Sequence, residues 1–391
     1  MIEKILIITP WYPTVVNGVR AVFIREQAIA LTKKYDVFVH IIARHPLEAI
    51  SGNIDANYPF KTLRSFYFLT PSLKGYTLYG RLHPRIIQYF SEFNFRKILD
   101  LWGKPDIIHA HVVWPAGYAS NYLGTKYHIP TVLTEHSCPF SMHTNERWKS
   151  AKVCETLHGV NQVIAVSPAL ADTINSFFQV PKIEIIGNVI HTDQFYPKLT
   201  NSNKLSTQEI FHFLIIASLD SRKGIQYLLD AAKLLLSKNI KEFHIWIAGK
   251  GPLRKNLENM VLDYGLANNC TFLGRLNHPD EVREWMQVCD AIISTSLHET
   301  FNVVLGEAMA CGKPVIATRS GGPDYVVDQD TGVLVNSADA EDIAHAMIKF
   351  IRREYIFDPD KIRQSVSSRF GQDAFVQNIS RIYDNISILS A

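Results

Sequence analysis

The stretch ETFNVVLGEAMACG, residues 299–312, places Glu299 and Glu307 with seven residues between them. An apolar run at residues 291–293 precedes it and predicts a short buried strand. Residues 302–310 predict a helix, which a glycine ends. We therefore expect Glu299 in the loop before this helix and Glu307 inside the helix.

The start of that helix is a potential phosphate site. The backbone N–H groups around Phe301, Asn302 and Val303 would be its unpaired donors, and such a terminus attracts anions. A carboxylate further along can accept hydrogen bonds from ribose hydroxyls, as acidic residues do in dinucleotide-binding folds. Two solvated glutamates are the simpler interpretation of an isolated pair at this spacing. The flanking glycines and the strand predicted at residues 313–317 disfavour it here.

The bulk properties predict an ordinary globular protein with more than one domain. A length of 391 residues exceeds what one hydrophobic core usually serves, so we expect two domains. The composition is 47% hydrophobic and 20% charged, and the net charge of +3 does not by itself indicate a nucleic-acid binder. We expect no nucleic-acid partner.

The N-terminus and the cysteines predict a compartment. Residues 1–4 run straight into an apolar strand at residues 5–8, with no secretory leader. No apolar run approaches the roughly 20 residues that span a bilayer. The five cysteines form no Cys-x-x-Cys pair and fit reduced thiols better than a disulfide framework. We therefore expect a cytoplasmic protein and leave open a peripheral contact with the inner face of the cell membrane.

Short apolar runs alternate with longer helical patterns along almost the whole chain. Runs that are apolar on both faces, with helices between them, indicate a parallel sheet covered on both sides. The predicted strands are residues 5–8, 37–42, 107–109, 131–133, 163–166 and 183–186, and then 213–217, 244–248, 271–273, 291–294 and 315–317. The pattern restarts near Phe211, after a polar segment at residues 198–208 that we interpret as a linker. The chain is therefore predicted to be α/β, with two doubly wound domains in series.

The block opened by Glu299 resembles the E-x7-E signature of the retaining glycosyltransferases of family 4. The resemblance extends over nearly the whole chain, more loosely in its first half, and continues through Thr318, Gly321-Gly322, Asp324 and residues 331–335. It implies the GT-B fold, in which two Rossmann-like domains face each other across a cleft. Residues 1–190, with a crossover helix at residues 373–391, would bind the acceptor, and residues 191–372 would bind the nucleotide-sugar donor.

The resemblance implies roles for residues of the second domain. The first glutamate of the family motif contacts the donor sugar and the second holds the ribose, which places these roles on Glu299 and Glu307. A family lysine that neutralises the donor diphosphate matches Lys223. Ser218 stands where the family has an arginine, so Arg222 is a candidate replacement, since fixed cations stabilise the charge that a departing diphosphate gains. The other donor-binding candidates are Gly18, Gly249, Gly274, Phe301, Asn302 and Val303.

The resemblance also implies roles in the first domain. Asn17 lies in the loop after the first strand. His109 and His111 lie at the end of the strand predicted at residues 107–109, in a segment that lines the cleft in the family. These three residues are the acceptor-binding candidates. His136 follows the strand at residues 131–133, where the family has a histidine that points toward the donor sugar, so we expect it to be catalytic with Glu299 and Lys223. A histidine hydrogen-bonded in a strand-end turn is the competing interpretation.

Two patterns suggest a metal. His109 and His111, at i and i+2, face the same side of a strand and could bind zinc, but a third ligand at a suitable spacing is not evident. Asp328 and Asp330 form a D-x-D pair, which holds a metal–diphosphate complex in the other major transferase fold. Here the pair precedes Thr331-Gly332 and indicates a solvated turn. We expect no metal and no cofactor, because the nucleotide-sugar is a substrate.

Residues 61–97 differ in composition from the rest of the chain. Seven basic residues and many aromatic residues occur there with a single acid, Glu92. Such a mixture can dock on an anionic membrane or a lipid-linked acceptor. Aromatic residues at helical spacing also pack on a core, and both interpretations stay open.

The predicted function is a retaining hexosyltransferase. By resemblance, it would move a sugar from a UDP- or GDP-sugar to a glycan or lipid-linked acceptor, in bacterial surface polysaccharide or glycolipid synthesis. A sugar-nucleotide epimerase of the same fold is one alternative and would need a different acid–base set. A non-catalytic nucleotide-sugar-binding protein is another, against which the intact Glu299, Glu307 and Lys223 argue.

Overall fold

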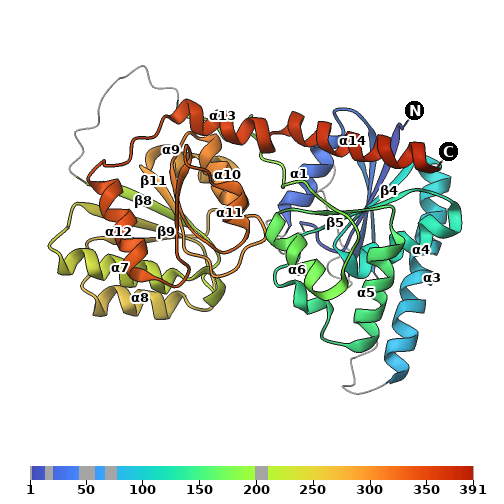
Figure 1. The fold of residues 1–391 in the computed structure, drawn as a ribbon, viewed down its shortest axis with the longest axis horizontal. Coiled ribbons are helices and arrows are strands. Elements are labelled where there is room, and N and C mark those ends of the chain that lie inside the picture. Colours follow the sequence, from blue (N-terminus) through green and yellow to red (C-terminus); the bar gives the residue numbers. More distant parts are fainter. Residues whose placement is uncertain (1, 14–20, 44–57, 67–76, 199–209, 391) are drawn as a thin grey trace. The chain divides into compact units, whose positions relative to one another are not determined.

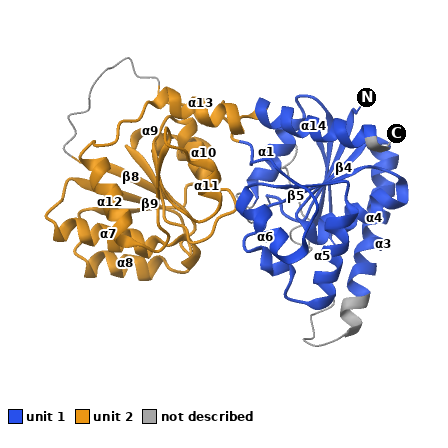
Figure 2. Cartoon of the chain, viewed as in Figure 1, with its two compact units in different colours: residues 1–189, 373–391 blue, residues 190–372 orange. Residues whose placement is uncertain are grey.

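A computed structural model describes residues 2–13, 21–43, 58–66, 77–198 and 210–390, without the side chains of residues 77–81, 389 and 390 (Figure 1). The chain forms two compact units. The first unit comprises residues 1–189 and 373–391, and the second comprises residues 190–372 (Figure 2). Asn17 and Gly18 lie outside the described residues, and so does nearly all of the predicted linker.

The first unit is built on a parallel sheet. Its described strands run in the order β3-β2-β1-β4-β5-β6-β7, with helices on both sides (Figure 1). The strands are β1 (Lys4–Thr9), β2 (Asp36–Ala43), β3 (Lys61–Phe66), β4 (Ile107–His111), β5 (Thr131–Glu135), β6 (Gln162–Ala165) and β7 (Ile183–Ile185). The helices are α1 (Val22–Leu31), α3 (Thr77–Trp102), α4 (Tyr118–Tyr127), α5 (Arg147–Gly159), α6 (Pro168–Phe178) and α14 (Gln372–Ser390), with short turns η1 (Val113–Gly117) and η2 (Phe140–His143).

The second unit repeats this architecture. Its described strands run in the order β10-β9-β8-β11-β12-β13. They are β8 (Phe211–Ile216), β9 (Phe243–Ala248), β10 (Cys270–Gly274), β11 (Ala291–Ser294), β12 (Val315–Thr318) and β13 (Gly332–Val335). The helices are α7 (Ile225–Ser237), α8 (Arg254–Asp263), α9 (Pro279–Val288), α10 (Val303–Ala310), α11 (Gly322–Val326), α12 (Ala340–Ile351) and α13 (Pro359–Phe370), with a short turn η3 (Ser221–Lys223). Two doubly wound parallel sheets confirm the predicted α/β class.

Buried aliphatic side chains explain why the strands and helices of each unit assemble. In the second unit, Leu228 and Leu235 of α7 and Ile245 of β9 are fully buried in one cluster. Full burial of such a side chain stabilises the fold by about 1.5–3 kcal/mol relative to exposure. The corresponding cluster of the first unit joins Ile5 and Ile7 of β1 to α1 and α14.

Two strands of the structure, β3 and β13, were not predicted from the sequence. β3 (KTLRSF) is an edge strand that pairs with β2, and its side chains are half-buried or exposed. An edge strand covered on few sides keeps polar residues, so no apolar run marks it. β13 is a short run that pairs with β12 at the far edge of the second sheet.

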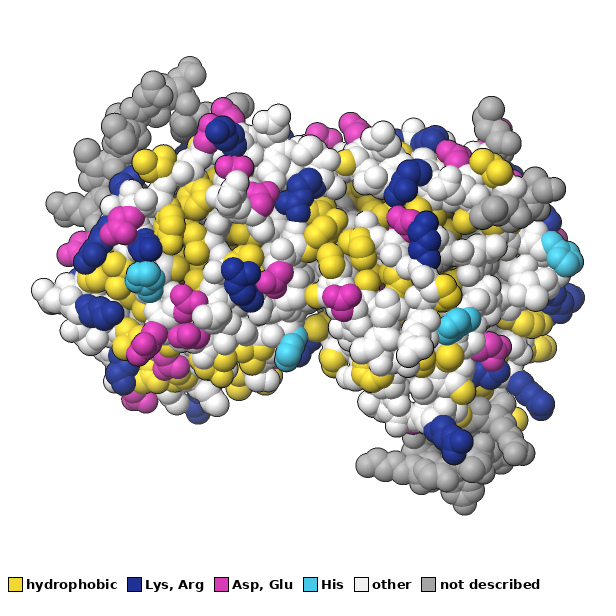
Figure 3. Space-filling view, viewed as in Figure 1, with side chains coloured by type: hydrophobic (Ala, Val, Ile, Leu, Met, Phe, Trp, Pro, Cys, Tyr) yellow, Lys and Arg dark blue, Asp and Glu magenta, His cyan; other side chains and the backbone are white. Residues whose placement is uncertain are grey.

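The surface carries both signs of charge. On the face shown in Figure 3, Lys and Arg side chains are interspersed with Asp and Glu side chains, as the small net charge of +3 leads one to expect. Among the described residues, no helix combines the length and the apolar character needed to cross a bilayer.

The C-terminal helix α14 is anchored to the first sheet by polar contacts in its buried face. The Tyr383 hydroxyl lies 2.7 Å from Nδ1 of His109 on β4, and both side chains are fully buried. The Tyr35 hydroxyl lies 2.7 Å from Oγ of Ser380. Burial raises the pKa of Tyr383 well above its usual value, so its hydroxyl remains protonated.

Removing the Tyr383 hydroxyl should destabilise the protein. Tyr383→Phe leaves a ring nitrogen of buried His109 without this partner, which costs about 1–3 kcal/mol of unfolding free energy. Urea unfolding followed by fluorescence measures the change. Tyr89→Phe is the matched control, because Tyr89 is 68% exposed, and a surface change of this kind shifts stability by less than about 0.5 kcal/mol. Equal stabilities of the two variants would contradict the anchor.

Candidate functional site

The carboxyl ends of β8 and β11 meet at the point where the strand order of the second sheet reverses. β8 pairs with β9 on one side and with β11 on the other. Open α/β sheets bind ligands beyond the carboxyl ends of their strands, at the point where the strand order reverses. The candidate site is therefore built from the loop after β8, which contains η3, and the loop between β11 and α10.

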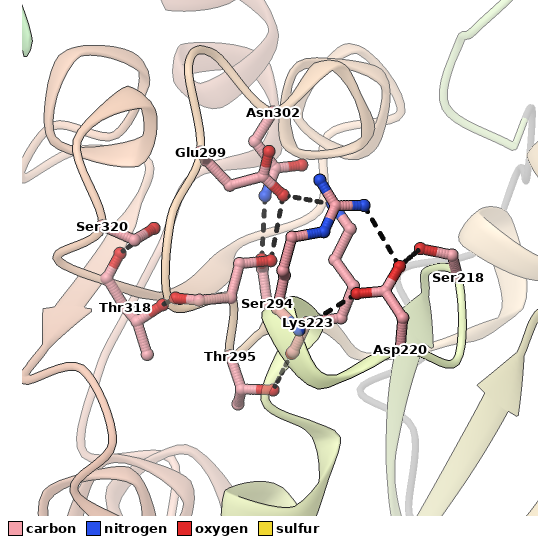
Figure 4. Close-up of polar contacts among 11 residues, drawn as sticks. Ser218, Asp220, Lys223, Ser294, Thr295, Glu299, Asn302, Thr318 and Ser320 are labelled. Atoms are coloured by element: carbon pink, nitrogen blue, oxygen red, sulfur yellow. Dashed lines mark hydrogen bonds and ion pairs between the residues drawn. The ribbon is translucent and has the colours of Figure 1, made fainter. Parts of the chain in front are cut away.

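An ion pair joins the two loops. Figure 4 shows the side chains of Lys223 and Glu299 pointing toward one another, and the Lys223 ammonium donates a short hydrogen bond to Oε1 of Glu299. Ser296 Oγ donates to the same oxygen at 2.9 Å. The Lys223 and Glu299 side chains are 23% and 13% exposed, so both charges are largely withdrawn from water yet still reachable. A lysine ammonium has three donors, which leaves capacity for a ligand.

The backbone around Glu299 is fixed on both sides. Its N–H donates to the carbonyl of Ser320 at 2.9 Å, and its carbonyl accepts from the N–H of Gly322 at 2.8 Å. The Thr318 hydroxyl at the end of β12 donates to the carbonyl of Ser296. These contacts hold the loop against the end of the neighbouring strand, so Glu299 has a defined position rather than that of a solvated surface charge.

Gly224 allows the Lys223 loop to approach the loop after β11. It has a φ of 61°, and a Cβ at this position would lie 2.1 Å from the carbonyl oxygen of Thr295. The Thr295 hydroxyl donates to the Lys223 carbonyl at 3.0 Å, and the Leu297 N–H donates to the Arg222 carbonyl at 2.7 Å. The glycine after Lys223 is therefore required by this close contact.

The helix α10 starts at Val303, so Glu299 lies in the loop before it, as the sequence predicted. Asn302 precedes the helix in the left-handed region, with φ 74° and ψ 75°. Its side chain does not cap the helix, because its amide donates to Oγ of Ser294 at 2.8 Å. The first turn of α10 holds no acidic residue. The partial positive charge of this helix start is thus available to an anion.

A second group of charges surrounds Ser218 in the loop after β8. Ser218 Oγ donates to Oδ2 of Asp220 at 2.7 Å, and the Arg222 guanidinium donates to the same oxygen at 3.2 Å. Burial alone would raise the pKa of Asp220, but these hydrogen bonds outweigh it and lower the pKa. Asp220 also accepts from the Arg222 N–H at 3.0 Å and so begins η3. An ionised Asp220 therefore holds Arg222 at the mouth of the loop that carries Lys223.

The other donor-binding candidates lie around these loops. Gly249 follows β9 with a φ of 146°, and a Cβ there would lie 1.8 Å from the Ala217 carbonyl oxygen. Its N–H donates to the carbonyl of Gly274 at the end of β10. Phe301 is buried against Phe370, so any ligand contact would come from its backbone. Glu307 is half-buried in α10, four residues before Cys311. Burial of the Cys311 thiol, together with the charge of Glu307, raises the pKa of Cys311 to about 12.

In the first unit, three histidine rings form a column on β4 and at the end of β5. His109 and His111 stack at 4.6 Å between ring centroids, and His111 stacks on His136 at 5.3 Å. The two β4 histidines thus share one side of the strand, as predicted. His111 Nδ1 and His136 Nε2 lie 3.0 Å apart. Burial lowers the pKa of His109 and His136 to about 3, so these rings are neutral at neutral pH.

The histidines of this column differ in their hydrogen-bond partners, which bears on the acceptor contacts predicted for His109 and His111. Both ring nitrogens of His109 have partners at 2.7 Å, namely the hydroxyls of Tyr383 and Thr134. This geometry leaves His109 no nitrogen for an acceptor and does not support the predicted acceptor contact, because the ring is fully buried as an anchor. His111 is also fully buried, although its Nε2 has no hydrogen-bond partner among the described residues.

His136 sits in a turn organised by a buried carboxylate. Glu135 accepts hydrogen bonds from the backbone N–H groups of Val113, His136 and Ser137 at 2.7–2.9 Å. The turn follows β5 directly, so His136 lies at the carboxyl end of a parallel strand, as expected. A neutral imidazole in this position can exchange hydrogen bonds with a sugar hydroxyl but cannot act as a strong acid.

The D-x-D pair is a structural turn. Asp328 Oδ1 accepts from the Asp330 N–H at 3.0 Å, and Oδ2 accepts from Ser365 at 2.8 Å and from Arg369 at 3.1 Å. The Asp328 carboxylate therefore ties the turn before β13 to α13. In the described part of the chain, no group of three or more His, Cys, Asp or Glu side chains is arranged to hold a metal ion.

Sequence reasoning missed the residues that position the candidate groups. Asp220 and Ser296 were given no role from the sequence, and Thr318 was noted only as part of the family resemblance, yet each orients Arg222 or the Glu299 loop. All three lie at or just after the carboxyl end of a predicted strand. Small polar residues at those positions are the signal that would have found them.

Comparisons with known proteins identify the family. The family model for Glycosyltransferase Family 4 matches residues 17–194, and the family model for Glycosyl transferases group 1 matches residues 198–368. The chain is 27% identical to an uncharacterized glycosyltransferase of Methanocaldococcus jannaschii, over 72% of this chain and 76% of that protein. It is also 27% identical to the D-inositol 3-phosphate glycosyltransferase of Paenarthrobacter aurescens, over 68% of this chain and 69% of that protein.

A solved structure shares the fold. The Anabaena protein HepE, in complex with UDP and glucose, superposes with a TM-score of 0.73 at 19% identity, over 98% of this chain and all of that chain. The match extends across both units. With the two family matches spanning most of its length, the chain belongs to glycosyltransferase family 4, enzymes of GT-B fold that transfer a sugar from a nucleotide-sugar.

Proposed function

We propose that the protein transfers a hexose from a UDP- or GDP-sugar to a glycan or lipid-linked acceptor with retention of configuration. The observation that carries this proposal is the ion pair between Lys223 and Glu299 beside the uncapped start of α10. A cation and a helix start together suit a diphosphate, and an adjacent carboxylate suits sugar hydroxyls. HepE, bound to UDP and glucose, supports a uridine donor, and the relative named for D-inositol 3-phosphate supports a hydroxylated acceptor.

The proposed reaction proceeds on one face of the donor sugar. The bond between the anomeric carbon and the phosphate oxygen breaks as an acceptor hydroxyl approaches from the same face. The proton of that hydroxyl passes to the departing phosphate oxygen. Lys223 and the N–H groups of Phe301, Asn302 and Val303 stabilise the charge that grows on the diphosphate.

We propose the remaining roles from the family resemblance, and the positions of the side chains support them. Glu299 would orient the donor sugar and Glu307 would accept hydrogen bonds from the ribose. Arg222, held by Asp220, would supply the cation that Ser218 cannot. His136 would be a neutral hydrogen-bonding group toward the sugar, since burial keeps its pKa near about 3. We propose a setting in surface polysaccharide or glycolipid synthesis.

A panel of UDP-, GDP- and ADP-sugars tests the function directly. We expect one donor to bind and to be hydrolysed slowly, and transfer to occur on addition of a suitable acceptor. Activity should survive EDTA, because Lys223 and the α10 start hold the phosphates and Asp328 is engaged by Arg369. Interconversion of two sugar nucleotides would indicate an epimerase. Binding without hydrolysis or transfer would indicate a non-catalytic binding protein, and a metal-reversible loss in EDTA would contradict the phosphate assignment.

Glu307→Ala should weaken donor binding. The ribose hydroxyls would lose a charged acceptor worth about 1.5–3 kcal/mol, which corresponds to an increase of roughly 10- to 150-fold in the donor dissociation constant. Isothermal calorimetry with the identified donor measures it. Glu341→Ala on α12 is a control for loss of a helix carboxylate elsewhere in the second unit. An unchanged dissociation constant for Glu307→Ala would rule out the ribose contact.

The two cations should act mainly on turnover. Lys223→Ala should lower kcat about 100-fold or more, and donor affinity much less, because the diphosphate charge grows as the bond breaks. Arg222→Ala should also lower kcat if Arg222 replaces the missing family arginine. Adding Ser218→Arg to Arg222→Ala should then restore activity, whereas Ser218→Ala should not. Steady-state kinetics on purified variants provides the readout, and normal turnover in Lys223→Ala would invalidate the loop assignment.

A further inference from the structure

The helix α3 has an unusual solvent face. Its buried face is continuous, with Ile87, Phe95 and Ile98 almost fully covered, and it packs on α4 and α5 at the outer side of the first unit (Figure 1). A surface helix normally places charged and polar residues on the opposite face. On α3 half of the exposed side chains from residue 82 onward are apolar, namely Leu82, Tyr89, Phe93 and Leu101, and the others are Arg85, Arg96, Lys97 and Asp100.

Three apolar side chains form an exposed stripe along α3. Leu82, Tyr89 and Phe93 are 43%, 68% and 50% exposed, and they lie at i, i+7 and i+11 on one helix face. We call these three residues the α3 stripe. Leu101, at 65%, is also exposed near the C-terminal end of the helix, but at i+19 it lies about 100° away from this face. Both interpretations of residues 61–97 therefore apply, each to different residues. Phe95 packs in the core, whereas Tyr89 and Phe93 are exposed.

Cations flank the α3 stripe. Arg85 and Lys97 are exposed on its two sides, and the Lys97 ammonium lies 4.3 Å from the centre of the Phe93 ring. Arg96 donates to one oxygen of Glu92 at 2.7 Å. Lys126 of α4 and the Tyr122 hydroxyl donate to the other oxygen at 2.6 and 2.8 Å. Glu92 is thus neutralised by its partners, whereas Asp100, near the C-terminal end of the helix, is exposed. The cations Arg85, Arg96, Lys97 and Lys126 outnumber the acids Glu92 and Asp100, so the charge around the stripe is net positive.

We propose that the α3 stripe docks the first unit on an anionic membrane surface. Leu82, Tyr89 and Phe93 would enter the interfacial layer, and Arg85, Arg96, Lys97 and Lys126 would contact the lipid phosphates. Apolar residues flanked by cations match the chemistry of such an interface, where hydrophobic insertion and attraction to anionic headgroups act together. Because the surface around the α3 stripe is positive, it attracts an anionic membrane more strongly than it would an uncharged apolar face of another protein. The proposal does not depend on which donor or acceptor the enzyme uses.

Co-sedimentation with vesicles tests the docking. Wild-type protein should bind phosphatidylcholine vesicles that contain about 30 mol% phosphatidylglycerol far better than pure phosphatidylcholine vesicles, because each cation near an anionic surface contributes about fivefold in affinity. Binding should weaken as salt rises from about 0.1 to about 0.5 M, since the screening length shortens. Arg85→Glu with Lys97→Glu should lower the vesicle affinity at least about 25-fold. Tyr89→Ser with Phe93→Ser should lower it about tenfold or more.

Matched variants of the second unit separate docking from general surface effects. Leu262→Ser removes an apolar side chain that is also 68% exposed, and Lys238→Glu with Lys255→Glu reverses two exposed charges. Both should bind vesicles like the wild type. Donor hydrolysis without vesicles should be unchanged in all these variants, so a failure of docking and a failure of the proposed function are distinguishable.

Two results would overturn the proposal. One is equal vesicle binding by the wild type and both α3 variants, and the other is no vesicle binding by the wild type. In the second case, sedimentation velocity without lipid could show a dimer that Phe93→Ser dissociates. That result would make the stripe an interface between two copies of the chain.

Discussion

The ion pair between Lys223 and Glu299 is the contact on which the arrangement of the candidate site depends. Its residues are 76 positions apart in the sequence and belong to loops after two neighbouring strands. A largely buried charge is tolerated only when it is paired, so each loop fixes the other. Ser296 on the carboxylate and Gly224 under the carbonyl of Thr295 follow from the same requirement. The reversal of strand order at β8 is what allows both loops to reach one place.

Much of this could be predicted because the apolar runs are strong. The buried strand β11 and the helix α10 lie where their sequences placed them, and Glu299 precedes the helix that contains Glu307. The pairing of side chains could not be predicted, since strand ends in a sequence do not reveal which strands are neighbours. The contact between His109 and Tyr383, 274 residues apart, depends on how α14 packs on β4. The strand β3 was missed because an edge position does not demand an apolar sequence.

The histidine column shows how burial limits chemistry. Parallel register places His109 beside Val132 and His111 beside Thr134, and the three buried histidine rings stack on one another. Desolvation lowers the pKa of these rings, which keeps them neutral and makes them hydrogen-bonding groups rather than acids. Of the three, His136 lies beyond the end of its strand. A position at the strand end, more than the type of residue, therefore distinguishes a candidate for ligand contact from an anchor of the core.

The carboxylates of the candidate site change how strongly its cations attract a diphosphate. Lys223 forms an ion pair with Glu299, and Arg222 forms one with Asp220. On the proposed function, an incoming diphosphate competes with these carboxylates, which moderates the attraction between the cations and the intact donor. As the glycosidic bond breaks, charge accumulates on the phosphate and the balance moves toward it. Interactions that are stronger in the transition state than in the ground state accelerate the reaction. Two cations held by carboxylates are therefore better suited to turnover than two unpaired cations would be.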